Sequence, residues 1–289
     1  MLRRVHADAL AWGEAVLGAA ITETEELSGG LTSTMLALTD ATGQRTVLRL
    51  MTNEPWRTHG AELTSRERTA QEELAPTQVP APTSIAVDAE GSVAGVAAHL
   101  MSRLPGTTTR EVDASTVAAM VEMLALIHDV KPAEPFRTYQ SWAWEAKWAI
   151  PPWTKHPESW QRAFDLLAEG PPSYAPTFLH RDYSHRNLLW RDGEISGVVD
   201  WVETSSGPVW LDAGHAATNL ALAFGPEPAK AFIDGYAALM AEKPQRYWLV
   251  MDAVGFLPPP GKNPLFGSPT ELQRLDRWVH DLIGTRGVH

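Results

Sequence analysis

The change of pattern along the chain constrains the fold more than any other sequence feature. In the first hundred residues, short apolar segments at 35–39 and 46–51 are separated by turn residues, which is typical of β-hairpins. A helical pattern at 60–75 and two further strands within 87–104 complete this part. Beyond Leu104-Pro105-Gly106, apolar residues recur at helical spacing. A sheet-rich first third followed by helices predicts an α+β chain with two lobes.

The predicted boundary between the lobes lies at the Pro-Gly turn, which gives an N-terminal lobe over 1–104 and a C-terminal lobe over 105–289. Asp113 or Ser115 is expected to cap the first helix of the second lobe. The remaining expected helices cover residues 8–20, 140–149, 157–169, 212–224, 228–241 and 270–283.

Composition excludes several classes of function. The chain of 289 residues has no cysteine, so disulfides, zinc ribbons, iron–sulfur clusters and a thiol nucleophile are excluded. A net charge of −11 argues against a nucleic-acid partner, because phosphate backbones are bound by clustered Lys and Arg. Asp8, Trp12 and Glu14 interrupt the apolar start, and no segment has the length of a membrane helix. We therefore expect a cytoplasmic protein that does not bind membranes.

The chemically informative segment runs from Phe178 to Trp201. Asp182 and Asn187 lie five residues apart, and Asp200 follows 13 residues after Asn187. Apolar pairs on both sides of a turn at 191–193 predict a short hairpin, with Asn187 at one end and Asp200 at the opposite end.

This set of residues fits phosphoryl transfer. The reaction needs a carboxylate that orients the attacking hydroxyl group and takes its proton, and oxygen ligands that hold Mg²⁺ on the nucleotide phosphates. Asp182 is placed for the first task, and Asn187 and Asp200 for the second. The sequence therefore predicts Asp182 as the catalytic residue and Asn187 and Asp200 as magnesium ligands.

The pattern His180-x-Asp182-x-x-x-x-Asn187, followed by Asp200-Trp201, resembles the aminoglycoside phosphotransferase and choline kinase-like family of small-molecule kinases. The resemblance covers about residues 25–220. It implies a bilobal protein kinase-like fold, with an antiparallel β-sheet in the N-terminal lobe and a mainly helical C-terminal lobe. It also implies ATP or GTP as the phosphate donor.

The resemblance extends to segments upstream of the motif. Arg49 occupies the place of the strand cation that pairs with phosphates, and Glu67 that of the helix carboxylate that orients this cation. Asp212 resembles an acidic residue that braces the catalytic loop. Further nucleotide contacts are implied for a loop and for a hinge whose backbone binds adenine, which together comprise Ser28, Gly29, Gly30, Thr32, Ser33, Met101 and Arg103.

Three positions depart from the family pattern. Arg49 stands where many relatives have Lys, so its reach and its pairing with Glu67 become questions for the structure. Ser184 stands where the family often has His, and His185 is displaced by one position. The first loop also lacks the spaced glycines of protein kinases.

Several residues have two interpretations. His180 is either a base or a residue that braces the loop, and His185 is either on the surface or close to the substrate. Glu203 either faces a cationic substrate or is a solvated loop residue. Five tryptophans either pack a helical insert or line a substrate pocket, and these are Trp142, Trp144, Trp148, Trp153 and Trp160.

The predicted function is an ATP-dependent O-phosphotransferase that acts on a hydroxyl group of a small molecule, with an aminoglycoside-like antibiotic as one acceptor. A choline-like amine or a sugar is a second class of acceptor, and the net charge is compatible with a cationic one. The motif is also compatible with a nucleotide-binding module without turnover, with a protein kinase, and with a metal-dependent hydrolase that uses His180, Asp182 and His185. The sequence does not determine the acceptor or the oligomeric state.

Overall fold

The structure is a computed structural model that describes residues 2–27, 32–109, 111–262 and 268–284. It divides into two compact units. Unit 1 comprises Met1–Gly106 and Ser196–Glu203, and unit 2 comprises Thr107–Ile195 and Thr204–His289. The sequence predicts one division near residue 104, whereas unit 1 also contains a later segment. That segment joins unit 1 through a 2.7 Å hydrogen bond from Val198 N–H to the carbonyl of Pro80.

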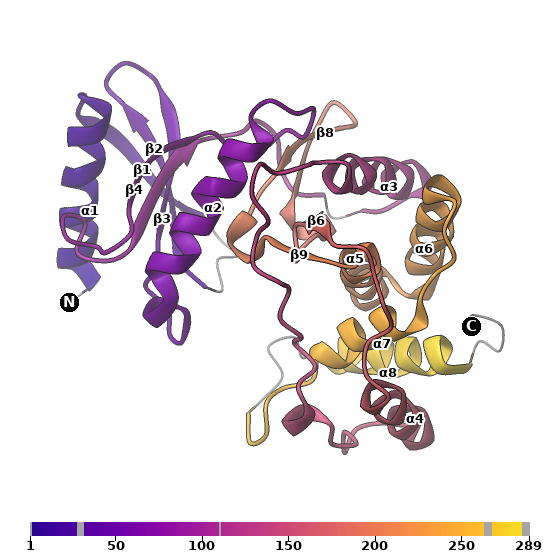
Figure 1. The fold of residues 1–289 in the computed structure, drawn as a ribbon. Helices are drawn as coiled ribbons and strands as arrows, with labels where there is room; N and C mark the ends of the chain where they lie inside the picture. Colours follow the sequence, from indigo (N-terminus) through magenta and orange to yellow (C-terminus); the bar gives the residue numbers. More distant parts are fainter. Residues whose placement is uncertain (1, 28–31, 110, 263–267, 285–289) are drawn as a thin grey trace. The chain divides into compact units, whose positions relative to one another are not determined.

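A five-stranded antiparallel sheet forms the centre of unit 1. Its strand order is β1-β2-β3-β5-β4, and the strands are β1 (Ile21–Leu27), β2 (Thr34–Asp40), β3 (Arg45–Leu50), β4 (Ser84–Asp88) and β5 (Ala98–Ser102). In Figure 1 this sheet lies between the helices α1 (Leu2–Leu17) and α2 (Gly60–Leu74). Short 3₁₀ turns, η1 (Trp56–His59) and η4 (Trp201–Glu203), complete the unit.

Side chains alternate between the two faces of the sheet. The leucines of β2 and β3 belong to a buried cluster that Ala9 and Trp12 of α1 join. Because successive side chains of a strand point to opposite faces, Arg45, Val47 and Arg49 of β3 share the second face. The register pairs Arg49 with Met35 on one side and with His99 on the opposite side.

Unit 2 is mainly helical. Its helices are α3 (Ala114–His128), α4 (Pro157–Ala168), α5 (Val209–Phe224), α6 (Pro226–Met240), α7 (Arg246–Gly255) and α8 (Pro269–Gly284). Helix α5 contacts α3, α6, α7 and α8 and is buried continuously from Trp210 to Leu222 (Figure 1). None of the helices in the described part of the chain has the length and apolar character that crossing a membrane requires.

Short strands and turns form the motif segment and its neighbours, and β8 runs from unit 2 into the later segment of unit 1. The strands are β6 (Thr177–Leu179), β7 (Leu188–Arg191), β8 (Glu194–Val198) and β9 (Ser205–Gly207), and the 3₁₀ turns are η2 (Glu145–Lys147) and η3 (His185–Asn187). β6 pairs with β9, and β7 with β8. Between β7 and β8, Asp192 and Gly193 have φ of 54° and 85°, the left-handed conformation of a tight hairpin turn.

Local capping explains where two helices begin. The Asp113 carboxylate accepts a 2.8 Å hydrogen bond from Thr116 N–H, so Asp113, and not Ser115, caps α3. At α8, Ser268 and Glu271 form a reciprocal capping box, because each side chain accepts a hydrogen bond from the backbone N–H of its partner.

The observed sheet and helices confirm the predicted α+β class, but the predicted helix at 140–149 is wrong. Only η2 forms there, because tertiary contacts override the local pattern: Trp142 packs against His215 of α5, and Trp148 stacks on Phe164 of α4. The sequence does not predict helix α7, since residues 248–254 are all buried and present no alternation of apolar and polar residues.

Candidate active site

The loop between β6 and β7 carries the predicted catalytic residue and is held by one buried carboxylate. Asp212 of α5 accepts hydrogen bonds from the backbone N–H groups of His180, at 2.8 Å, and Arg181, at 2.7 Å. Arg181 has φ of 74°, a conformation that costs a non-glycine residue roughly 1–2 kcal/mol. The two charge-assisted hydrogen bonds offset this strain. Asp212 thus contacts the loop as the bracing role implied by the resemblance requires.

Asp182 is bound by a histidine that the sequence does not indicate. His215 Nε2 lies 2.8 Å from Asp182 Oδ1, and His215 Nδ1 lies 3.0 Å from Asp252 Oδ1. Burial lowers the pKa of His215, but the Asp252 charge and the hydrogen bonds to both carboxylates outweigh burial and raise it to about 9. The imidazole is therefore protonated at neutral pH and donates to both carboxylates.

The Asp182 carboxylate is ionised in this arrangement. Burial acts to raise the pKa of Asp182, but the hydrogen bond and the charge of His215 outweigh it and keep the pKa below its ordinary value. The Asp182 side chain is still 35 % exposed, whereas the Asp252 side chain is fully buried. Asp182 is thus the member of this group that a substrate can reach.

One face of α5 contacts the whole catalytic loop. Asp212, His215 and Asn219 are three and four residues apart, which places them on the same side of the helix. Asp212 binds the start of the loop, His215 binds Asp182, and Asn219 Oδ1 accepts a hydrogen bond from Arg186 near the end of the loop. The loop is therefore fixed along its length by a central buried helix.

The predicted metal ligand Asn187 is oriented by the same loop. Its Nδ2 donates a 2.8 Å hydrogen bond to the Asp182 carbonyl. Because the nitrogen of the amide is used in this way, the amide oxygen is the side-chain atom that the predicted ligand role would use.

The neighbouring histidines contact the protein interior. His180 Nδ1 accepts a 3.2 Å hydrogen bond from Asp182 N–H, in agreement with the bracing interpretation. The surface interpretation of His185 is wrong, because the residue is buried and packs edge-on against Phe224. Burial, together with the nearby charge of Arg186, lowers the pKa of His185 to about 4. Ser184 is also buried, and its carbonyl accepts a hydrogen bond from Asn187 N–H.

In unit 1, Arg49 is the centre of a buried polar network. Its guanidinium donates to Glu67 twice, with Nε 2.9 Å from Oε2 and Nη2 3.0 Å from Oε1. Nη2 also lies 3.0 Å from Asp200 Oδ1, and Nη1 donates to Ser33 Oγ at 3.0 Å. The planar group of arginine therefore keeps the pairing with Glu67 and also reaches the predicted metal ligand Asp200.

A second partner of Glu67 is His99, which lies beside Arg49 in the sheet. His99 Nδ1 is 2.9 Å from Glu67 Oε2, and His99 Nε2 is 2.9 Å from Ser84 Oγ. Burial acts to raise the pKa of Glu67, but the charge of Arg49 and the hydrogen bond of His99 lower it to about 2. Alternation along β5, which places His99 on the face of Arg49, is the sequence signal that indicates it.

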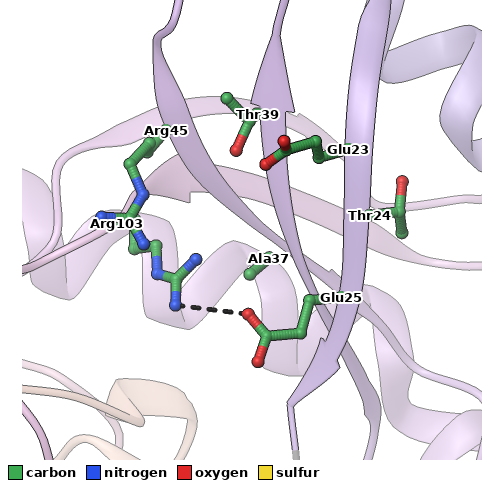
Figure 2. A pocket seen from close by; sticks show the side chains of 7 residues that line it. All are labelled: Glu23, Thr24, Glu25, Ala37, Thr39, Arg45 and Arg103. Carbon is green, nitrogen blue, oxygen red and sulfur yellow. Dashed lines mark ion pairs between the residues drawn. The ribbon is translucent and has the colours of Figure 1, made fainter.

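The sheet face that carries Arg49 also carries a cavity of about 460 Å³. Figure 2 shows its lining, with Glu25 and Arg103 facing one another across a 3.6 Å ion pair. The remaining lining residues are Glu23, Thr24, Ala37, Thr39 and Arg45. Arg45, which lines this cavity, and Arg49 share one face of β3.

Some of the predicted nucleotide contacts lie outside the described residues, and others lie in or next to the sheet of unit 1. Ser28, Gly29 and Gly30 lie outside the described residues, and Thr32 is half-buried. Met101 is inside β5, with Val47 and Ser84 as partners on its two sides. Arg103 N–H donates to the carbonyl of Arg45 at 3.3 Å. The adenine contacts implied for Met101 and Arg103 therefore concern backbone that already takes part in the sheet, and they stay a prediction.

The tryptophan cluster serves mainly to pack unit 2. Trp160 is fully buried and donates to Asp276, Trp153 packs edge-on against Trp160, and Trp148 stacks on Phe164. Trp144 is 46 % exposed. Together with Trp148 it lines a cavity of about 310 Å³, whose further lining residues are Tyr139, Ser141, Ala143, Glu145, Leu167, Pro171, Tyr247 and Met251.

Glu203, in η4 of unit 1, is half-buried.

Comparison with known proteins identifies the family. The model of the phosphotransferase enzyme family matches residues 23–249. The chain belongs to this family. Membership of the phosphotransferase enzyme family confirms the resemblance that the motif indicates. A comparison with curated proteins finds no match.

Solved structures of phosphotransferases share the fold. Aminoglycoside phosphotransferase APH(4)-Ia has a TM-score of 0.68 at 15 % identity, with 97 % of this chain and 99 % of that chain covered. A thermostable mutant of the same enzyme, in a ternary complex with ADP and hygromycin B, has a TM-score of 0.65 at 16 % identity and the same coverage. Macrolide 2′-phosphotransferase MphH from Brachybacterium faecium has a TM-score of 0.60 at 18 % identity, with 86 % and 91 % covered. These likenesses confirm the predicted protein kinase-like fold.

Proposed function

We propose that this member of the phosphotransferase enzyme family transfers the terminal phosphate of ATP or GTP to a hydroxyl group of a small molecule. The observation that carries the proposal is the placement of Asp182. This carboxylate is hydrogen-bonded by His215, is 35 % exposed, and lies in a loop that α5 holds at several points.

Asp182 supplies the function that phosphoryl transfer demands of a protein carboxylate. Most of the catalysis of this reaction comes from positioning and charge stabilisation, with the base accepting the proton of the attacking hydroxyl group. His215 binds Oδ1 of Asp182. Oδ2 is therefore the atom that we assign to the acceptor hydroxyl group.

The side chains of Asn187 and Asp200 are suited to Mg²⁺. An amide oxygen and a carboxylate are hard oxygen donors, and Mg²⁺ needs only one or two protein ligands besides phosphate and water. Asn187 presents its amide oxygen, and Asp200 has φ of 69° and a side chain that is 29 % exposed. When bound, the ion would neutralise charge on the nucleotide phosphates.

Unit 1 supports a nucleotide as the phosphate donor. Arg49 is a fixed cation beside Asp200, and the cavity on the same sheet face is large enough for a nucleoside. The ADP and AMP-PNP complexes of thermostable APH(4)-Ia mutants, which share the fold, also support this choice. We assign Arg49, with Glu67 behind it, to the transferring phosphate, and Thr32, Ser33, Met101 and Arg103 to the rest of the nucleotide.

A small-molecule acceptor is supported by two kinds of phosphotransferase with the same fold. Aminoglycoside and macrolide phosphotransferases both share the fold. In unit 2, the cavity beside Trp144 and Trp148 has a largely aromatic and apolar lining, with Glu145 as the acidic residue among the described lining residues. Acceptors with an apolar surface should therefore be tested alongside polycationic ones.

The described residues support neither a metal-dependent hydrolase nor a protein kinase. Such a hydrolase would gather His180, Asp182 and His185, yet no set of three such side chains forms a metal-ligand group within the described ranges. A protein kinase needs a long peptide-positioning segment, whereas only five residues separate η4 from α5.

The test is a phosphate-transfer screen with Mg²⁺ and ATP or GTP over aminoglycosides including hygromycin B, macrolides, choline-like amines and sugars. We expect transfer to at least one class, and a loss of about 10²–10⁴-fold in kcat for Asp182→Asn. Asp192→Asn, at an exposed carboxylate of the β7–β8 turn, is the matched control and should retain full activity. Nucleotide binding by titration calorimetry without transfer to any acceptor would instead indicate a binding module.

A further inference from the structure

His215 occupies a position that a packing role does not explain. An imidazole in the middle of an apolar helix loses hydration, and burial alone would keep it neutral. Here it lies between two carboxylates. The centre of its ring is 5.3 Å from that of Trp142 and 5.5 Å from that of Phe256. These contacts fix the plane of the ring, so its two N–H groups point in defined directions.

The far carboxylate is itself fixed. Asp252 is fully buried in α7, and Arg181 Nη1 lies 3.6 Å from its Oδ1. Arg181 in turn lies 3.8 Å from the centre of the Trp142 ring and donates to the carbonyl of Gln140. The chain of contacts from Arg181 through Asp252 and His215 ends at the partly exposed Asp182.

We propose that His215, oriented by Asp252, is a positioning residue that holds the catalytic carboxylate of Asp182 in the geometry that receives the acceptor hydroxyl group. This inference rests on the proposed function and adds two residues to it. One N–H of His215 binds Oδ1 of Asp182, which leaves the carboxylate one orientation and directs Oδ2 to the acceptor.

The position of Asp182 is sensitive to this contact because its side chain is 35 % exposed and His215 Nε2 lies 2.8 Å from its Oδ1. Without a donor at His215, the carboxylate can rotate about its side-chain bonds, and a displacement of about 1 Å at a reacting group costs roughly 10²-fold in rate. Binding of the nucleotide depends on different residues and is not expected to change.

The kinetic test compares three variants with the probe on which the wild type is active, either an acceptor from the screen or water as acceptor in ATP hydrolysis. His215→Leu removes both donors, His215→Gln keeps one amide donor, and His280→Gln is the control at a histidine that contacts Ser159 away from the loop. We expect kcat to fall by about 50-fold or more in His215→Leu, less than about 10-fold in His215→Gln, and less than about twofold in the control, with KM for the nucleotide constant. A His215→Leu enzyme within about threefold of wild type in kcat would overturn the proposal.

A second measurement needs neither activity nor a substituted His215 that folds. In protein labelled with ¹⁵N at its ten histidines, His215 should show both ring nitrogens protonated at pH 7. Asp182→Asn should shift these signals, and the control Asp192→Asn should not. If Asp182→Asn leaves the ring-nitrogen signals of His215 unchanged, the contact between the two residues is contradicted. If the spectra agree but the wild type transfers no phosphate, the proposed function fails while the contact stands. If the wild type is active and His215→Leu is equally active, the proposed function stands and the positioning role of His215 fails.

Discussion

Arg49 and Glu67, on a strand and a helix of the same unit, are joined by two parallel hydrogen bonds of 2.9 and 3.0 Å. The pair is buried, with side-chain exposures of 4 % and 0 %. Burial of two charges is costly unless the geometry is good and the remaining groups are bonded. Both conditions are met, because Arg49 also donates to Ser33 and Asp200, and Glu67 also pairs with His99.

Replacement of Arg49 by lysine should therefore be a severe change although the charge is kept. An ammonium group cannot donate to Glu67, Ser33 and Asp200 with the planar geometry of a guanidinium. We expect Arg49→Lys to lower the free energy of unfolding by about 2 kcal/mol and to raise KM for the nucleotide by about 10-fold. Urea denaturation and steady-state kinetics measure the two effects. Arg68→Lys, at an exposed ion pair of α2, is the control and should change neither.

Asp212→Asn should destabilise the fold through the catalytic loop. The carboxylate accepts from two backbone N–H groups and lies 3.1 Å from His128 Nε2, and an amide replaces one of these acceptor oxygens by a donor. We expect a loss of about 3 kcal/mol in the free energy of unfolding, since a buried N–H is left facing another donor. Equal denaturation midpoints for Asp212→Asn and Asp192→Asn would contradict this expectation.

The protonated His215 should make stability depend on pH in a defined direction. Its pKa is about 9 in the folded protein, against 6.5 for an unperturbed histidine, so the folded state binds the proton more tightly. The resulting stabilisation is complete below pH 6.5, declines between pH 6.5 and 9, and is lost above pH 9; its upper limit is about 3 kcal/mol. The difference in unfolding free energy between wild type and His215→Gln should shrink over this interval. The same comparison with His280→Gln should give no such trend.

The cap of α3 permits a direct test of a local prediction. Asp113→Ala removes the acceptor for Thr116 N–H and should lower the free energy of unfolding by about 1 kcal/mol. Ser115→Ala removes the second candidate cap that the sequence offers and should cost less than about 0.5 kcal/mol. Thermal or urea denaturation of both variants distinguishes the two caps. A larger loss of stability in Ser115→Ala than in Asp113→Ala would contradict the assignment of Asp113 as the cap.

Local sequence rules are reliable where the signal is local. The hairpin of β2 and β3, the capped helix α3 and the order of Asp182, Asn187 and Asp200 all follow from neighbouring residues. The rules are unreliable at 140–149, where the tryptophans find partners in distant elements, and at α7, which is buried on all sides. In both segments tertiary packing decides the conformation.

By itself, the sequence determined the family motif, the α+β class and the residue types that phosphoryl transfer requires. Only the tertiary structure decided which buried residues act on the motif. His215 lies 33 residues from Asp182 and 37 from Asp252, and His99 lies 32 residues from Glu67. The physical reason is that helix and strand patterns depend on near neighbours, whereas the partner of a buried polar side chain depends on which elements pack together. Here the central position of α5 brings His215 between two carboxylates that no local pattern connects.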